Sequence, residues 1–317
     1  MRNKGLGALV LSVVVVGLVV PASALAAKPA ATTGAAANVT FQSARVNGSV
    51  DPNRETTNYY FQYGTTIAFG TNSSLFPVGG GANPVRVSID LGGLAPQTRY
   101  FYRIVAQNRS GVTLGKRRSF TTRRQPLGVS LAASPNPIPF GQGTVLAGTL
   151  TGTGNAGRRI VLQANPWPYT QGFQNATNEQ ITNAQGGFSF PVLPAFVPYN
   201  VQYRVQMPER PAVVSPIATV GVKPYVKTKV GDRRVRRGRR VRFSGTVRPG
   251  RDGAQIAIQK KRGSTWVTVG GTVVRSGGRY SKRVRLRRGG TFRVWTGVGD
   301  QQYANNNGRS VRIRTFR

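Results

Sequence analysis

From residue 38 onward the chain consists of short runs in which apolar and polar residues alternate, and glycine, proline and asparagine separate these runs. Alternation with a period of two places successive side chains on opposite faces of a β-strand. Apolar residues do not recur at helical spacing in this part of the chain. The pattern therefore predicts an all-β protein, and its many short strands are typical of β-sandwiches.

The first predicted module covers residues 38–122. In it Tyr59, Phe61 and Tyr63 alternate with polar neighbours, so they share one face of a strand. Further along, residues 94–103 read Leu-Ala-Pro-Gln-Thr-Arg-Tyr-Phe-Tyr-Arg. This run and the rest of the module resemble the fibronectin type III family, although the early core tryptophan of the animal domains is missing. The resemblance implies a spacer or binding module in which Tyr100 is the tyrosine corner.

Two further modules, residues 126–222 and 224–317, look like repeats of each other. Landmarks recur in the same order at a nearly constant spacing. They are Gly141, Gly148, Gln163, Gly187-Phe188, Tyr203-Arg204-Val205 and Ser215 in the second module, and Gly238, Gly245, Gln259, Gly278-Arg279-Tyr280, Phe292-Arg293-Val294 and Ser310 in the third. Both modules resemble bacterial immunoglobulin-like repeats of surface proteins. We therefore expect three tandem β-sandwich domains, and the short proline-containing linkers predict a stiff, monomeric rod.

The N-terminal segment, residues 1–26, has a basic start, an apolar stretch and a closing Ala24-Leu25-Ala26. This pattern predicts a signal peptide that is cleaved after Ala26. The apolar stretch is shorter than the roughly 20 residues that a membrane span needs. Apart from Lys28, residues 27–37 are small and contain nothing large to bury, which predicts a flexible leader. We expect a secreted protein that associates with the cell surface.

The chain contains no cysteine and no histidine. Disulfides, thiol nucleophiles, histidine acid–base schemes and the usual zinc sites are thereby excluded, and we expect no metal or cofactor. Catalysis by paired carboxylates would need two of the acidic residues to converge. Asp51 and Glu55 are close in sequence, but Asp51 begins an apparent turn that its side chain would cap. The sequence therefore predicts no enzyme and no catalytic residues.

Charge is the most unusual property of the chain. Lysine and arginine total 45 against 8 acidic residues, a formal net charge of +37. More than half of these cations follow Val222. In the runs 240–243 and 283–287 arginine alternates with apolar residues, so the arginines would lie on outer faces. Immunoglobulin topology makes these runs the neighbouring B and E strands, and 233–240 the turn between strands A and B.

We predict that a polyanion binds this basic third module, because arginines crowded on one sheet repel one another unless an anion covers them. The predicted polyanion-binding residues are Arg233, Arg234, Arg236, Arg237, Arg239, Arg240, Arg242, Arg283, Arg285, Arg287, Arg293, Arg312 and Arg314. An alternative is that genome composition favours arginine and the basic face is only solvated.

Aromatic side chains are candidates for carbohydrate binding by stacking. In the second module the loop containing Trp167, Tyr169 and Phe173 is one such site, and a minor core under a long loop is the alternative. In the third module Trp295 would lie outward beside Arg293. Partial cover by a neighbouring loop is the alternative for Trp295.

Three functions remain open. The first is a non-catalytic envelope protein that adheres electrostatically to an anionic cell-wall polymer or acidic polysaccharide, with an anionic membrane surface as a further possible partner. The second is a carbohydrate- or protein-binding adhesin that uses the aromatic loop of the second module. The third is binding of extracellular nucleic acid through the third module, for which no base-reading motif is present.

Overall fold

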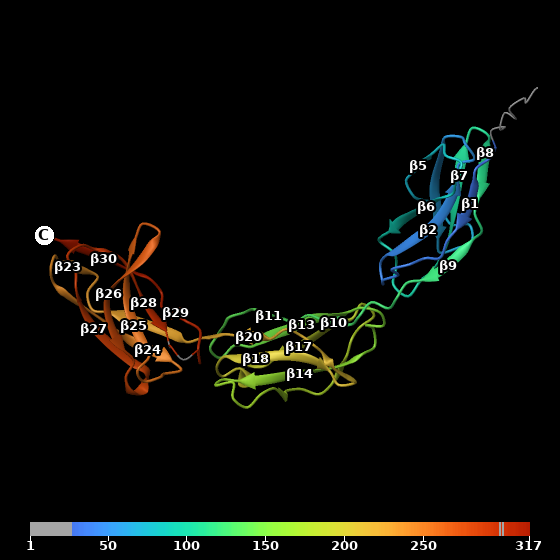
Figure 1. Cartoon of the computed structure of the whole chain (residues 1–317). Coiled ribbons are helices and arrows are strands. Elements are labelled where there is room, and N and C mark those ends of the chain that lie inside the picture. The colour runs from blue at the N-terminus through green and yellow to red at the C-terminus, as the bar shows by residue number, and fades with distance from the viewer. Residues whose placement is uncertain (1–26, 298, 300) are drawn as a thin grey trace, which may run out of the picture. The chain divides into compact units, whose positions relative to one another are not determined.

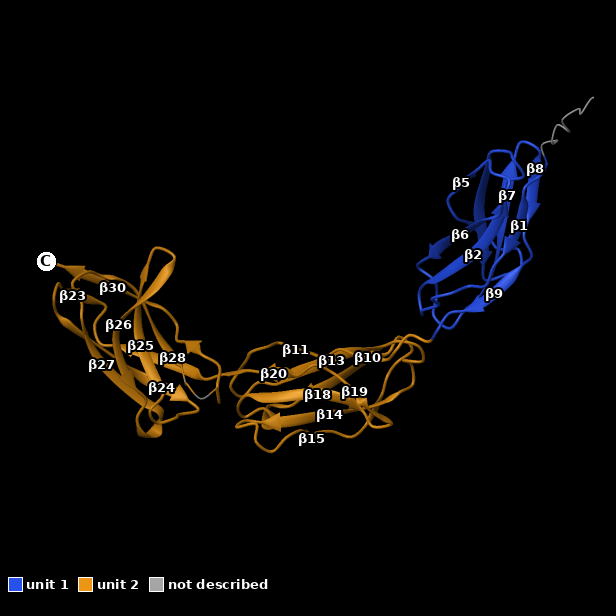
Figure 2. Cartoon of the chain, viewed as in Figure 1, with its two compact units in different colours: residues 1–123 blue, residues 124–317 orange. Residues whose placement is uncertain are grey.

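The computed structural model describes residues 27–297, 299 and 301–317, so the predicted signal peptide lies outside the described residues. The chain divides into two compact units, residues 1–123 and 124–317 (Figure 2). One hydrophobic cluster lies in the first unit and two lie in the second. The described residues form β-strands and two short 3-10 turns, with no α-helix among them, which confirms the predicted all-β class.

The first unit is a sandwich of two antiparallel sheets. One sheet has the order β1-β2-β6, and the other has the order β4-β3-β7-β8 with β5 and β9 added at its sides. Its core contains the fully buried Phe61, Tyr102 and Ile104. The strands are β1 (Ala30–Thr33), β2 (Ala44–Asp51), β3 (Thr57–Gly64), β4 (Thr71–Asn72), β5 (Phe76–Gly79), β6 (Val85–Leu91), β7 (Arg99–Asn108), β8 (Gly111–Leu114) and β9 (Arg118–Thr121).

The prediction of a flexible leader over residues 27–37 is wrong for Ala30–Thr33. This segment is the edge strand β1, paired antiparallel with β2. Thr33 is buried and accepts the backbone N–H of Ile104 at 3.2 Å, and the Tyr102 hydroxyl donates to the carbonyl of Gly34 at 2.7 Å. An edge strand needs backbone pairing more than large side chains, so a segment of alanine and threonine can complete a sheet.

Tyr100 occupies the position that the fibronectin type III resemblance assigns to the tyrosine corner. Its hydroxyl accepts the backbone N–H of Ala95 at 3.0 Å. The ring is buried and stacks on Phe120, with 5.7 Å between centroids and 16° between planes. The hydroxyl therefore ties the preceding loop to the start of β7, which is the contact that defines this corner.

The second sandwich lies in the second unit and encloses Leu146, Phe190 and Tyr203. One sheet joins β10, β13, β11 and β17, the other joins β15, β14, β18, β19, β16 and β20, and β12 pairs in parallel with β21. The elements are β10 (Gly128–Val129), β11 (Ala132–Ser134), β12 (Ile138–Pro139), β13 (Thr144–Thr151), β14 (Arg159–Pro166), β15 (Gln174–Asn175), β16 (Gln180–Ile181), β17 (Gly187–Val192), η1 (Pro194–Phe196), β18 (Val201–Met207), β19 (Arg210–Val214), β20 (Ala218–Val220) and β21 (Val222–Lys223).

The third sandwich packs a three-stranded sheet, β22-β24-β27, on a sheet of order β23-β30-β28-β25-β26 that also carries β29 (Figure 1). Phe243, Ile258 and Phe292 lie in its core. The elements are β22 (Tyr225–Val230), β23 (Arg234–Arg236), β24 (Arg240–Arg248), β25 (Gln255–Arg262), β26 (Thr265–Val273), η2 (Ser276–Gly278), β27 (Arg279–Arg285), β28 (Gly290–Gly297), β29 (Asn306–Asn307) and β30 (Val311–Phe316).

The second and third sandwiches share a glycine–aromatic contact that explains one of their repeated landmarks. Gly148 on β13 lies directly opposite Phe188 on β17, and Gly245 on β24 lies directly opposite Tyr280 on β27. A Cβ at Gly148 would come within 2.7 Å of the Phe188 ring, and one at Gly245 within 2.8 Å of the Tyr280 hydroxyl. Both positions require glycine because a Cβ would also lie 2.0 Å from the carbonyl oxygen of Ser130 or 1.8 Å from that of Lys227, so backbone on one side and an aromatic side chain on the other fill the space.

Candidate functional site

The outer face of the sheet β22-β24-β27, called the basic face below, is built by strict alternation. Val241 and Phe243 on β24 and Val284 on β27 are buried in the core. Their neighbours along the same strands therefore point to solvent. The residues that form the basic face are Tyr225, Lys227, Lys229, Arg240, Arg242, Ser244, Thr246, Arg248, Arg279, Ser281, Arg283 and Arg285.

Arginines oppose one another directly across two strands of the basic face. In the antiparallel register of β24 and β27, Arg240 lies opposite Arg285 and Arg242 lies opposite Arg283. All four side chains are exposed. The sequence predicted these two runs as neighbouring strands with adjacent arginines, and the structure brings them together in that way. Like charges that face each other across strands weaken a sheet, so this arrangement raises the free energy of the unliganded protein.

Short hydroxyl side chains occupy the middle of the basic face. Ser244 lies opposite Lys229 on one side and Ser281 on the other, and Thr246 lies opposite Lys227. Short side chains between long cationic ones leave a hollow with a volume of about 790 Å³. Its lining residues are Tyr225, Lys227, Lys229, Arg242, Ser244, Gly245, Thr246, Arg248, Arg275, Arg279, Tyr280 and Ser281.

Lysines and arginines from all three strands thus surround a floor of hydroxyl groups. Hydroxyls and guanidinium N–H groups are both hydrogen-bond donors to anionic oxygens. Arg242 already donates from Nε to the Ser281 hydroxyl at 3.0 Å, which holds its guanidinium over the floor. The hollow can therefore accept an anionic group through charge and hydrogen bonds together.

Among the described residues, carboxylates do not neutralise the charge of the basic face. Ion pairs occur in the other two sandwiches, where Arg45 pairs with Asp90 at 2.7 Å and Arg159 with Glu209 at 3.0 Å. Within the described part of the third sandwich, neither Asp232 nor Asp252 lies within 4.0 Å of a cationic nitrogen. The basic face therefore projects its positive potential into solvent.

Sequence reasoning missed several cations that line this hollow. Lys227 and Lys229 alternate along β22, and Arg279 lies at the start of β27. Lys227-Thr228-Lys229 shows the same period of two that identified the arginine runs, so the signal was present in the sequence. Arg275 comes from the loop before β27, and no sequence pattern would have placed it here.

The basic run 233–240 was predicted as a turn between strands A and B, and that prediction is wrong for Arg234–Arg236. These residues form β23, which pairs in parallel with β30, because the buried Val235 anchors the run to the core. The arginines of the run consequently separate. Arg234 lies beside Arg314 on the six-stranded sheet, Arg237 and Arg239 lie in the turn, and Arg240 begins the basic face.

The remaining predicted arginines fall on different surfaces. Arg312 and Arg314 lie on β30 of the six-stranded sheet, and Arg233 is exposed before β23. Arg287 follows β27 and is also exposed. The Nε of Arg285 donates to the backbone carbonyl of Gly238 at 3.1 Å, so part of its hydrogen-bonding capacity is already used. The predicted residues therefore do not form one continuous site.

Arg293 was predicted as a polyanion-binding residue, and its side chain already has partners within its own sheet. Its Nε donates to Oε1 of Gln259 at 2.8 Å, and its guanidinium lies 4.2 Å from the centre of the Trp266 ring. The side chain is only partly exposed, and burial lowers the pKa of Arg293. This arginine is therefore engaged by its own sheet.

The aromatic loop of the second sandwich does not present a single stacking platform. The Trp167 ring contacts Tyr199 edge-on at 6.4 Å and has the guanidinium of Arg251 at 5.3 Å. Phe173 lies under the guanidinium of Arg204 at 4.3 Å. Burial raises the pKa of Tyr169, whose side chain is partly covered. The three rings have different neighbours, which favours the alternative that the loop covers a minor core.

Trp295 is partly covered. A Cβ at Gly297 would lie 2.3 Å from the Trp295 ring, so the ring lies close over the backbone of its own strand. The ring also borders a hollow of about 460 Å³ between β25 and β26. This placement agrees with partial cover more than with a free stacking surface.

The acidic residues of the first unit have structural contacts. Asp51 accepts the backbone N–H of Asn53 at 3.0 Å, as expected for a turn cap, and Glu55 accepts the Ser110 hydroxyl at 2.6 Å. Over the described ranges, no three histidine, cysteine, aspartate or glutamate residues come together to hold a metal ion. No helix in the described part of the chain is long and apolar enough to cross a membrane.

No family model matches the chain, and no curated protein matches its sequence. A solved tetra-tandem repeat from the extending region of a large adhesion protein is similar at 15% identity, over 90% of this chain and 74% of that one, with a TM-score of 0.31. The FN1–FN3 domains of chicken CNTN1 are similar at 13% identity over 90% and 99% of the two chains, with a TM-score of 0.30. Domains A168–A170 from titin are similar at 13% identity over 92% and 100%, with a TM-score of 0.33. These TM-scores are low, so the description of the fold rests on the strand pairing itself.

Proposed function

We propose that this chain is a secreted, non-catalytic protein of the cell exterior whose third sandwich adheres to an anionic polymer. The partner would be an anionic cell-wall polymer or an acidic polysaccharide that lies along the basic face. The first two sandwiches would act as a spacer that carries this module. The single observation that supports the proposal most is the register that puts Arg242 opposite Arg283 beside a hydroxyl-lined hollow.

The energetic argument starts from the unliganded state. Arg240, Arg242, Arg283 and Arg285 repel one another, and no carboxylate within 4.0 Å relieves this repulsion in the described part of the sandwich. A polymer with regularly spaced anionic groups would relieve several repulsions at once. Binding would also release the counterions that the polymer holds in solution. This release makes binding favourable and dependent on the salt concentration.

A polymer suits this face better than a single small anion. The cations are spread over three strands, from Lys229 on β22 across Arg242 to Arg279 on β27. A small anion reaches only a few of them, whereas successive groups of a chain can contact them in turn, and each contact raises the effective concentration of the next.

The experiment measures binding of residues 27–317 to two soluble probes, sodium polyphosphate and polygalacturonate, between ~50 and ~200 mM salt. The variant carries Lys229→Gln, Arg242→Gln and Arg279→Gln, one change on each strand of the basic face. The control carries Arg109→Gln, Arg124→Gln and Arg210→Gln, which remove the same charge from exposed positions outside the third sandwich.

We expect the basic-face variant to lose most of its affinity, and the slope of log K against log salt to fall by about 2, since each neutralised phosphate contributes ~0.7–0.9. The control should keep its slope nearly unchanged. Equal binding by the two variants, or binding that does not respond to salt, would refute the proposal. Preference for duplex or single-stranded DNA over both probes would instead favour the nucleic-acid alternative.

A further inference from the structure

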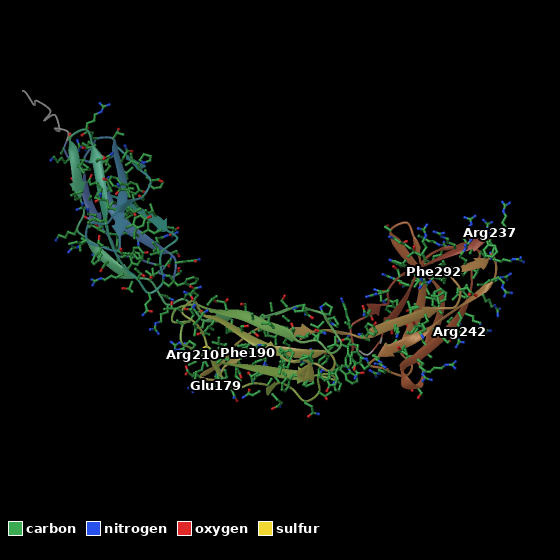
Figure 3. The ribbon with its side chains drawn as sticks, turned by 180° about the vertical axis from the view of Figure 1, so that it is seen from behind. Glu179, Phe190, Arg210, Arg237, Arg242 and Phe292 are labelled. Atoms are coloured by element: carbon green, nitrogen blue, oxygen red, sulfur yellow. The ribbon has the colours of Figure 1, made fainter. Side chains whose placement is uncertain are left out.

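Three connections meet at the end of the third sandwich that is remote from the second. The second sandwich leads directly into β22 at Tyr225, which lies opposite Arg248, so β24 begins at the far end. At that end the turn 237–239, the hairpin between β25 and β26, and the connection between β27 and β28 come together. Arg237 marks this end in Figure 3, whereas Phe292 lies inside the sandwich and Arg242 on its side.

Hydrogen bonds fix these connections to one another. The backbone N–H of Gly238 donates to the carbonyl of Leu286 at 2.8 Å, and the N–H of Leu286 donates to the carbonyl of Arg239 at 3.0 Å. The Nζ of Lys260 on β25 donates to the carbonyl of Arg288 at 2.8 Å. The end of the sandwich is thus held together by backbone hydrogen bonds and by the side chains of Lys260 and Arg285, whose Nε donates to the carbonyl of Gly238.

The strands β25 and β26 and the connection between β27 and β28 border an open hollow of about 760 Å³, called the tip hollow below. Its lining residues are Lys260, Arg262, Val269, Arg285, Leu286, Arg287, Arg288 and Phe292. The lining thus consists of cationic side chains around three apolar ones, and no acidic residue is among them. Five cations line this hollow, and two of them, Arg287 and Arg288, come from a connection and not from a strand of the flat basic face.

Burial and neighbouring charges at the tip hollow change the pKa of Lys260. Its Nζ lies 5.7 Å from the centre of the Phe292 ring, and the side chain is only partly exposed. Burial lowers the pKa of Lys260, and the charges of Arg262 and Arg288 lower it further. The ammonium is therefore held in a place that disfavours its charge, and an anion in the hollow would reverse that effect.

We propose that the tip hollow is a second binding site, which shares only Arg285 with the basic face and takes a compact oxyanion, a phosphate or sulfate ester. Such a group presents several acceptor oxygens to guanidinium forks and to an ammonium at the same time. The site would recognise a chain end or a branch group of this kind, whereas the basic face contacts the length of a polymer. The tip site does not depend on the proposed function of the basic face.

The test uses residues 27–317 and inorganic pyrophosphate, with sulfate as a second probe, at constant ionic strength. Affinity is measured by calorimetry, and the ¹³Cε resonance of Lys260 reports its pKa. The tip variant carries Arg262→Gln and Arg288→Gln, and it leaves the backbone carbonyl of residue 288 in place for Lys260. The matched control carries Arg242→Gln and Arg279→Gln from the basic face.

We expect pyrophosphate to bind the unaltered protein, to raise the pKa of Lys260, and to bind the tip variant at least about tenfold more weakly. The basic-face control should keep both the affinity and the shift. The proposal is overturned if the tip variant binds as well as the unaltered protein, if the control loses binding instead, or if the Lys260 resonance does not respond.

If the tip variant fails to fold, the single change Arg287→Gln replaces it and must weaken binding. Sulfate in place of pyrophosphate distinguishes the two ester classes. Because the tip variant and the basic-face control remove charge from different hollows, a failure of polymer binding at the basic face would leave this result standing.

Discussion

Arg293 on β28 lies directly opposite Gln259 on β25, and its Nε donates to the Gln259 side-chain carbonyl at 2.8 Å. The other two sandwiches contain the same cross-strand contact. Arg103 donates to Gln62 at 2.8 Å, and Arg204 donates to Gln163 at 2.7 Å, each pair in direct register. An aromatic ring lies against each guanidinium, Phe69 for Arg103, Phe173 for Arg204 and Trp266 for Arg293.

This contact predicts that Arg293 stabilises the fold and does not serve a ligand. Arg293→Lys keeps the positive charge but removes the Nε donor and the planar group that stacks on Trp266. We expect the free energy of unfolding to fall by about 1–2 kcal/mol, from a lost hydrogen bond and a lost cation–π contact. Urea unfolding of the chain measures the change, with Arg312→Lys on the neighbouring strand as the control. A loss of salt-dependent polymer affinity larger than in the control would show that Arg293 contacts the ligand after all.

Arg293 shows which structural features a sequence pattern predicts and which it does not. Alternation along the strand correctly placed Arg293 and Trp295 on the outer face, and Phe292 and Val294 between them are buried. The partner of Arg293 depends on which residue of β25 lies opposite it, and this register is set by the packing of the whole sheet. Periodicity identifies the face of a residue, but the cross-strand neighbour that occupies its side chain comes only from the structure.

The prediction of a flexible N-terminal leader was wrong for a related reason. Ala30–Thr33 carries no alternating apolar pattern, and its pairing with β2 depends on free backbone groups at the edge of that strand. The prediction that the arginines of 240–243 and 283–287 lie side by side was confirmed. Their alternation is visible within each strand, and the order of the strands in a sandwich is a property of the fold class. The hollow between them could not be foreseen, since it depends on Ser244 lying opposite both Lys229 and Ser281.

Because Arg242 and Arg283 lie opposite each other, we expect removal of one of them to raise the stability of the protein and to lower its affinity for a polymer. Arg283→Thr removes one side of the repulsion, so the unliganded protein should become more stable by about 0.2–1 kcal/mol at low salt. The gain should shrink as salt screens the charges, and polymer affinity should fall. Urea unfolding at two salt concentrations measures the effect. Arg312→Thr is the control, because Arg312 lies opposite Thr291 instead of another arginine. A variant no more stable than this control would argue against repulsion on the basic face.

The surroundings of Gly245 predict that this position tolerates no side chain. A Cβ there would lie 1.8 Å from the carbonyl of Lys227 and 2.8 Å from the Tyr280 hydroxyl. Gly245→Ala must push β22 away from β24, and we expect a loss of about 3 kcal/mol, at the upper end for overpacking. Gly271→Ala is the matched control in the same sandwich, since its Cβ would meet only the carbonyl of Ile256 at 3.7 Å. Thermal and urea unfolding compare the two, and an equal loss in both would show that general glycine effects explain the result.

Two buried phenols predict loss of stability in alkali. Burial raises the pKa of Tyr203 and is the main cause that raises the pKa of Tyr280, and their hydroxyls donate to the carbonyls of Phe196 and Lys227, each at 3.0 Å. Unfolding returns both phenols to their ordinary pKa of about 10, so above that pH the unfolded chain loses protons before the folded one. The stability that depends on the neutral phenols is therefore complete below about pH 10 and is lost as the pH rises toward the folded pKa values.

Urea unfolding at pH 8 and at pH 11, together with tyrosinate absorbance, measures this dependence. Tyr280→Phe should reduce the alkaline loss, because the phenylalanine ring has no proton to release. Tyr225→Phe is the control, since Tyr225 is 62% exposed in the same sandwich, and it should leave the loss unchanged. Identical pH dependence in the two variants would show that Tyr280 does not contribute to the alkaline loss.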